Sequence, residues 1–315
     1  MIISASRRTD IPAFYSQWFM NSIRAGFCVV PNPFNTKQLS RVSLKLEDVD
    51  AIVFWSKNPA PLFPYLDELD ERGFRYYFQF TLNDYPDALE PGVPDVDKRL
   101  ETFMKLAERL GSMRVIWRYD PIIISNITSV DFHQERFAKL ASSLSGATNR
   151  VMVSLCDFYR KTDRRLAALE QEGYFFNKEA ASSAEVASLL KNIATIASRH
   201  NMEVFSCAED IDFSNLGIRP GMCVDADLVK KIWSISVCTT KDQTQRKHCR
   251  CVVSKDIGMN DTCMHGCRYC YSTRNNALAE RRYSEHDPNS PVIWGHSEIS
   301  SKSTDKKHLQ IKLPI

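Results

Sequence analysis

The stretch AIVFWSK, residues 51–57, has five consecutive apolar residues followed by a serine and a lysine. A continuous apolar run of this length is typical of a strand in a parallel sheet covered on both faces, because an exposed face would need alternating polar residues. Five other runs have the same character: IISAS (2–6), RYYFQFTL (75–82), RVIWRYD (114–120), RVMVSLCD (150–157) and EVFSCAE (203–209). FCVVPNP (27–33) is either a further strand or an extended loop.

Amphipathic stretches between these runs predict helices over residues 11–25, 61–72, 96–111, 131–145 and 183–200. The last of them has a capping serine, Ser183, at its start. Alternating strand and helix signals predict an α/β fold with a parallel sheet. For 315 residues the simplest such fold is one TIM-like (β/α) barrel, which we expect over residues 1–283. A partly flexible C-terminal extension is expected over 284–315.

The composition is that of a globular protein, with 43% hydrophobic and 25% charged residues. The formal net charge of +3 argues against a strongly basic nucleic-acid-binding domain. No apolar run approaches the roughly 18 to 20 residues of a membrane span, and the N-terminal segment does not resemble a secretory signal. We therefore expect a cytoplasmic protein without membrane contact, in which clustered cysteines indicate metal ligands or catalysts rather than disulfides.

Charged or polar side chains directly follow the apolar runs, at the strand ends where a parallel barrel builds its active site. We predict catalytic roles for Arg8, Asp10, Lys57, Arg118 and Asp120. We predict contacts with a cofactor for Arg7, Ser56, Asn58, Thr81, Asp157, Glu209 and Tyr269. Rim charges of both signs suit a small-molecule substrate. The alternatives are that some of these groups only cap helices, or form structural buried ion pairs.

Three cysteines with C-x3-C-x2-C spacing, Cys263, Cys267 and Cys270, lie in one short stretch, with Tyr269 just before the last. Three thiolates on a tight loop can hold three irons of a four-iron four-sulfur (4Fe-4S) cluster and leave the fourth iron open to another ligand. Structural zinc is the alternative, with a fourth ligand drawn from His265, Cys249 or Cys251.

The string TCMHGCRYCYS (262–272) resembles the cluster loop of the radical S-adenosylmethionine (SAM) superfamily, in the branch that contains spore photoproduct lyase. The resemblance implies that Cys263, Cys267 and Cys270 ligate a 4Fe-4S cluster whose fourth iron is chelated by SAM. It also implies reductive SAM cleavage to a 5′-deoxyadenosyl radical, with electrons from a reductase, a flavodoxin or a ferredoxin.

In that superfamily the loop follows the first strand of the barrel, whereas here most strand signals precede it. A circular permutation reconciles the two, with VVSKDIG (252–258) as the usual first strand and IISAS (2–6) as the usual second. The expected fold is therefore a permuted partial barrel with the cluster loop at 263–270. No Gly-Gly-Glu string follows IISAS, so Arg7, Arg8, Thr9 or Asp10 would have to bind the SAM amino group instead.

The chain also resembles the domain of unknown function 1848 family, a prokaryotic group. The resemblance covers about residues 1–275 and rests on ISASRRTDIPA, FWSKNP, FQFTLNDY, EPGVP, WRYDPI, CAE and the terminal cysteine cluster. It implies no particular reaction.

Four more cysteines, Cys207, Cys223, Cys249 and Cys251, lie upstream of the first three. We predict that they hold a second iron-sulfur cluster, with structural zinc as the alternative. Cys28, Cys156 and Cys238 are expected to be core residues.

Two functional hypotheses follow. The first is a radical SAM-like enzyme. The second is a zinc-stabilised barrel that binds nucleic acid or protein without SAM chemistry, for which the basic tail KSTDKKH (302–308) is slight support.

Overall fold

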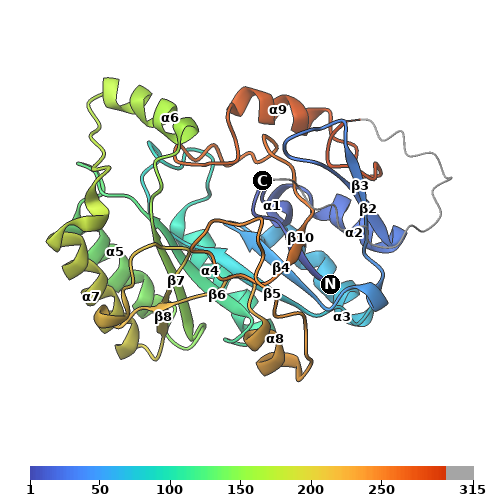
Figure 1. The fold of residues 1–315 in the computed structure, drawn as a ribbon, viewed down its shortest axis with the longest axis horizontal. Coiled ribbons are helices and arrows are strands. Elements are labelled where there is room, and N and C mark those ends of the chain that lie inside the picture. The colour runs from blue at the N-terminus through green and yellow to red at the C-terminus, as the bar shows by residue number, and fades with distance from the viewer. Residues whose placement is uncertain (296–315) are drawn as a thin grey trace.

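The computed structural model describes residues 1–295 and contains one large parallel sheet (Figure 1). The strands lie in the order β10 (Ser254–Asp256), β1 (Ile2–Ala5), β4 (Ala51–Ser56), β5 (Tyr76–Thr81), β6 (Val115–Ile122), β7 (Arg150–Leu155), β8 (Glu203–Ser206) and β9 (Arg219–Pro220). All neighbouring pairs are parallel. The α/β prediction is confirmed. Within the part of the chain that the structure describes, β10 and β9 do not pair, so closure into a TIM barrel is not confirmed.

Each of the six apolar runs forms a strand of this sheet: β1, β4, β5, β6, β7 and β8. The ambiguous stretch at 27–33 also forms a strand, β2 (Phe27–Pro31), which pairs antiparallel with β3 (Leu39–Ser43) in a separate two-stranded ribbon. The predicted strand within 252–258 is β10, and it pairs with β1 in the register Ile2 to Ser254.

Helices connect the strands of the sheet. They are α1 (Ile11–Phe14), α2 (Ser16–Ala25), α3 (Leu66–Glu71), α4 (Val96–Leu110), α5 (Val130–Ser143), α6 (Arg160–Gln171), α7 (Ala184–Arg199), α8 (Ala226–Trp233) and α9 (Asn276–Ser284). The stretch predicted as one helix over 11–25 is divided into α1 and α2 at Tyr15. That over 61–72 is a 3-10 turn, Ala60–Tyr65, followed by α3, because Pro64 lies inside it.

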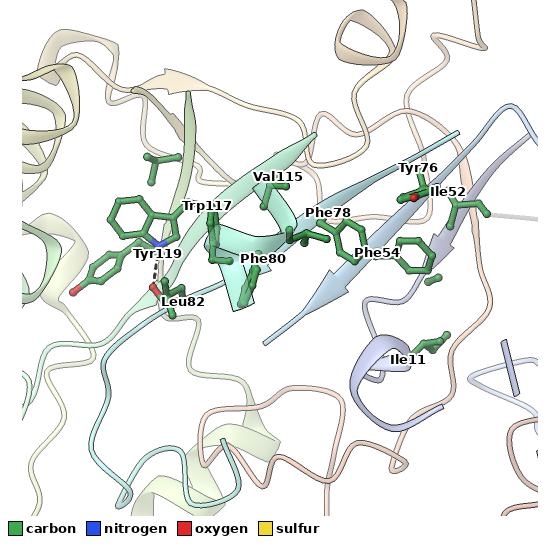
Figure 2. Packing of buried hydrophobic residues seen from close by; sticks show 14 of the residues in the cluster. Ile11, Ile52, Phe54, Tyr76, Phe78, Phe80, Leu82, Val115, Trp117 and Tyr119 are labelled. Atoms are coloured by element: carbon green, nitrogen blue, oxygen red, sulfur yellow. Dashed lines mark hydrogen bonds between the residues drawn. The ribbon is translucent and has the colours of Figure 1, made fainter. Parts of the chain in front are cut away.

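The main core lies between the sheet and helices α2, α3, α4, α5 and α7. Figure 2 shows the aromatic side chains of β4, β5 and β6 packed along this face. The rings of Phe54 and Phe78 stack with centroids 4.9 Å apart. The indole of Trp117 donates to the carbonyl of Leu82 over 2.9 Å, so its one polar group is satisfied within the core (Figure 2).

The opposite face of the sheet packs against α8 and the chain around it. Val53, Tyr77 and Met152 lie in this second cluster, together with Cys223 and Cys251. Gln79 and Arg118 are buried too. Successive residues of a strand point to opposite faces, so these polar side chains lie on the face away from Phe78 and Trp117. This face therefore carries buried polar groups, among them Gln79 and Arg118.

The segment around β10 lies beside the N-terminal strand β1. Figure 1 shows β10, in orange, beside the blue N-terminal segment. After α9 the chain packs on α2 and β2, where Trp18 donates to the carbonyl of Ser290 and Val29 to that of Pro291. The extension predicted over 284–315 thus includes packed residues, and its part from 296 onward lies outside the described residues. None of the helices in residues 1–295 is long and apolar enough to cross a membrane.

Candidate functional site

A cavity of about 450 Å³ lies at the carboxyl ends of the parallel strands. Most of the residues singled out in the sequence line it: Arg7, Arg8, Asp10, Ser56, Lys57, Thr81, Arg118, Asp120, Asp157, Cys207, Cys223, Cys249, Cys251, Cys263, Cys267, Tyr269 and Cys270. Two predicted residues do not line it. Asn58 turns back so that its backbone N–H meets Ser56 Oγ, and Glu209 lines a second cavity of about 270 Å³. The sheet thus gathers residues spread over the whole chain into one site.

Arg118 and Asp120, from the end of β6, form an ion pair whose side chains are 6% and 18% exposed. Arg118 also donates to Cys223 Sγ over 2.8 Å. Burial alone would lower the pKa of Arg118, but the charge of Asp120 outweighs it and the pKa is raised well above its usual value. Burial would raise the pKa of Asp120, and Arg118 lowers it instead. Both groups are therefore charged within the cavity wall.

Lys57 follows β4 and makes two contacts at 13% exposure. Its Nζ lies 2.7 Å from Glu90 Oε1 and 3.0 Å from the Tyr269 hydroxyl. The Tyr269 hydroxyl donates to the same carboxylate oxygen. Burial would raise the pKa of Glu90, but the Lys57 charge lowers it. Sequence reasoning missed Glu90, although it begins the EPGVP string, because it follows no strand.

Asp10 caps α1 and connects it to β4 and the cysteine loop. Its Oδ1 accepts from Ser56 Oγ over 2.7 Å, and its Oδ2 accepts from the backbone N–H of Lys57 over 2.7 Å. His265 Nε2 lies 2.8 Å from Oδ2. His265 thus acts as a hydrogen-bonding residue of the loop, with its Nδ1 3.2 Å from the carbonyl of Gly92.

Asp256, the last residue of β10, is a second residue that sequence reasoning missed. It accepts from Ser4 Oγ, Ser6 Oγ and the backbone N–H of Arg7, and Arg8 Nε lies 3.1 Å from its Oδ1. Burial would raise its pKa, but Arg8 and these donors lower it. The strand-end rule could have found it if β10 had been included among the apolar runs.

The loop that carries Cys263, Cys267 and Cys270 packs on the segment around Gly92. The N–H of Gly92 donates to the carbonyl of His265 over 3.0 Å. A Cβ at Gly92 would lie 2.8 Å from that oxygen, so only glycine allows this approach.

The three thiols differ in their surroundings. The backbone N–H groups of Ser272 and Thr273 both point at Cys270 Sγ, each over 3.4 Å. Burial raises the pKa of Cys263 to about 12 and that of Cys267 well above its usual value. Deprotonating these two thiols therefore requires a compensating positive charge, which a bound metal supplies.

The other four predicted ligands also lie together. Cys207 Sγ and Cys223 Sγ are 3.2 Å apart, and the backbone N–H of Cys223 donates to Cys251 Sγ over 3.3 Å. A hydrogen bond with Cys251 lowers the pKa of Cys249 to about 7. Among residues 1–295, no three or more His, Cys, Asp or Glu side chains are arranged to hold a metal ion.

The remaining cysteines follow the sequence expectation only in part. Cys28 is fully buried in the main core, as predicted. Cys156 is half-buried and lines the cavity. Cys238 is exposed, so its assignment to the core was wrong. Its neighbours in the sequence are apolar, but they pack on α8 from a surface segment.

Comparison with known proteins adds one relationship. No curated protein matches the chain as a relative. A family model described as a domain of unknown function, number 1848, matches residues 2–272, which include every strand of the described residues and the seven cysteines predicted above as metal ligands. The chain therefore belongs to the domain of unknown function 1848 family.

Proposed function

We propose that this protein is a radical SAM enzyme in which Cys263, Cys267 and Cys270 hold a 4Fe-4S cluster. The observation that carries the proposal is the position of β10. It is an edge strand, parallel to β1, and the cysteine loop follows it at the carboxyl end of the sheet. A permuted partial barrel has this arrangement, with β10 as its first strand and β1 as its second.

The donor set suits a cluster. In a cluster each thiolate binds its own iron, so the ligands line a cavity instead of converging on one ion. The three thiols come from one loop and line one cavity. The two N–H groups directed at Cys270 Sγ are the kind of hydrogen bond that tunes such clusters. When bound, the cluster supplies the electron that cleaves SAM.

The residues of the chain have separate tasks in this proposal. Asp10 holds the loop in place through His265. Lys57 and Tyr269 share the Glu90 carboxylate, which orients the wall beside Cys267. The wall that holds both Arg118 and Asp120 suits a small substrate with charged groups. The protein therefore binds and orients the cofactor and the substrate and excludes water, and the cofactor carries the radical chemistry.

A reductase, flavodoxin or ferredoxin would deliver the electron. A cytoplasmic location fits, because the ten cysteines of the chain are all free thiols in the structure.

The first test is anaerobic purification followed by iron and sulfide analysis and electron paramagnetic resonance (EPR) of the reduced protein with and without SAM. We expect about four irons or more per chain and a cluster signal that changes when SAM is added. Cys267→Ala should abolish that change and reductive SAM cleavage to methionine. Cys238→Ala, at an exposed cysteine outside the cavity, should keep both.

Zinc without sulfide at this loop would contradict the proposal. It would favour the zinc-stabilised binding protein, for which binding to DNA or RNA that weakens with salt is the direct measurement.

A further inference from the structure

Four cysteines have no role in the proposed SAM site: Cys207, Cys223, Cys249 and Cys251. We call them the cysteine quartet. Its members come from three separate places: the end of β8, the turn before α8, and the segment before β10. The fold brings them together, and all four line the same cavity as the loop that carries Cys263, Cys267 and Cys270.

Contacts that the structure shows join three members of the quartet. Cys207 Sγ lies 3.2 Å from Cys223 Sγ, and the backbone N–H of Cys223 donates to Cys251 Sγ over 3.3 Å. Cys249, two residues before Cys251, lines the same cavity. Four soft donors at one place match the ligand set of an iron-sulfur cluster or of zinc.

Positive charge surrounds the quartet. Arg118 donates to Cys223 Sγ over 2.8 Å. Burial would lower the pKa of Arg7, but Cys251, the Asp256 carboxylate and Cys223, which lie near it, together raise it. Its Nη2 is buried without a hydrogen-bond partner among the described residues, while its guanidinium lies 5.0 Å from the Trp55 ring centroid. A buried donor without a partner costs free energy. A metal cluster bound by four thiolates carries a net negative charge and would supply an acceptor.

Backbone donors complete the surroundings. The N–H groups of Cys223 and Val224 both donate to Cys251 Sγ, over 3.3 and 3.4 Å. N–H donors directed at a ligand sulfur stabilise its thiolate form and tune a cluster.

We infer that Cys207, Cys223, Cys249 and Cys251 hold a second iron-sulfur cluster, in the same cavity as the proposed SAM site. Iron-sulfur is preferred to zinc because, among the described residues, no three of these side chains converge on one ion, and each thiolate of a cluster binds a different iron. This second site does not depend on the first, since the two sets share no residue.

The test uses a variant that lacks the first set, Cys263→Ala with Cys267→Ala and Cys270→Ala, purified without oxygen or reconstituted with iron and sulfide. We expect about four irons and about four sulfides per chain, with an EPR signal that does not respond to SAM. Adding Cys223→Ser to this variant should remove the iron. Adding Cys238→Ser instead should leave it unchanged.

A second measurement keeps the test independent of how the variants fold. In the wild-type protein, the quartet should resist alkylation after reconstitution and react after chelator treatment, while Cys238 reacts in both states. Three results would overturn the inference: a folded triple variant without iron, one zinc per chain without sulfide, or a Cys207 to Cys223 disulfide found by mass spectrometry. The first would leave the SAM proposal intact, because that site is tested by the response to SAM.

Discussion

Two largely buried pairs of opposite charge lie at the cavity wall. Lys57 faces Glu90, which is 1% exposed, and Arg118 faces Asp120. Removing one partner of such a pair leaves an uncompensated buried charge, which costs about 3–5 kcal/mol. These pairs therefore contribute to the stability of the fold and are also candidate functional residues. For every variant of them, stability must be measured together with activity.

Another buried residue, His133, makes the free energy of unfolding depend on pH. His133 is fully buried, with Nδ1 2.8 Å from the Tyr119 hydroxyl and Nε2 2.9 Å from the carbonyl of Ile123. Burial lowers its pKa from 6.5 to about 4. The unfolded chain therefore binds an extra proton between these two values, and the stability from the neutral ring is lost as the pH falls from about 6.5 to 4.

We expect His133→Gln to remove this part of the pH dependence, which is at most about 1.4 kcal/mol per pH unit. Urea unfolding of chelator-treated protein between pH 4 and pH 7 measures it. His248→Gln, at an exposed histidine, is the control and should keep the wild-type slope. A wild-type slope in His133→Gln would contradict the assignment.

At the scale of elements, local sequence signals explain some helices and not others. α7 begins as predicted, because Ser183 Oγ accepts from the backbone N–H of Val186 over 3.1 Å. The sequence analysis did not predict α6, α8 or α9. α6 and α8 each have an apolar and a polar face, and Asp225 caps α8, so both have a local pattern that the sequence analysis did not recognise. The exposed and buried faces of α9 hardly differ in polarity, so this helix depends on what it packs against.

The cap of α7 can be tested alone. Ser183→Ala should lower the free energy of unfolding by about 1 kcal/mol, because the N–H of Val186 loses its partner. Ser198→Ala, at an exposed position inside the same helix, should be neutral or slightly stabilising, because alanine is the better helix former. Chemical denaturation of both variants gives the comparison. Equal effects would mean that the cap contributes nothing.

At the scale of the whole molecule, the site is assembled by contacts between segments far apart in the chain. Gly92 and His265 are 173 residues apart and make two contacts. The ring Nδ1 of His265 lies 3.2 Å from the carbonyl of Gly92, and the backbone N–H of Gly92 donates to the carbonyl of His265. Asp256 similarly joins β10 to Ser6 and Arg8 near the N-terminus. The position of the cysteine loop therefore depends on the folding of the complete sheet.

Gly92→Ala tests this assembly. The added Cβ would meet the carbonyls of His265 and Met264 at 2.8 and 2.9 Å, so the loop must shift. Overpacking of this kind costs about 1–3 kcal/mol. We expect the variant to keep the circular dichroism spectrum of the wild type and to lose the SAM-dependent EPR change. Asp87→Ala, at an exposed position in the same segment, should keep both. Unchanged SAM response in Gly92→Ala would show that this contact does not position the loop.

The sequence by itself determined the six central strands, their parallel arrangement and the polar groups at their ends. These depend on local apolar runs and on alternation with helices, which any stretch of chain carries within itself. The placement of β10 beside β1 was anticipated only through the resemblance of the cysteine loop to that of another superfamily.

The tertiary structure alone decided which distant groups meet. It brought Glu90 to Lys57 and Asp256 to Arg8. Within the described residues β9 and β10 do not pair, so closure of the sheet into a TIM barrel is not confirmed. The physical reason is that strand order and long-range contacts depend on the packing of the whole chain, and a local pattern of apolar and polar residues carries no information about them.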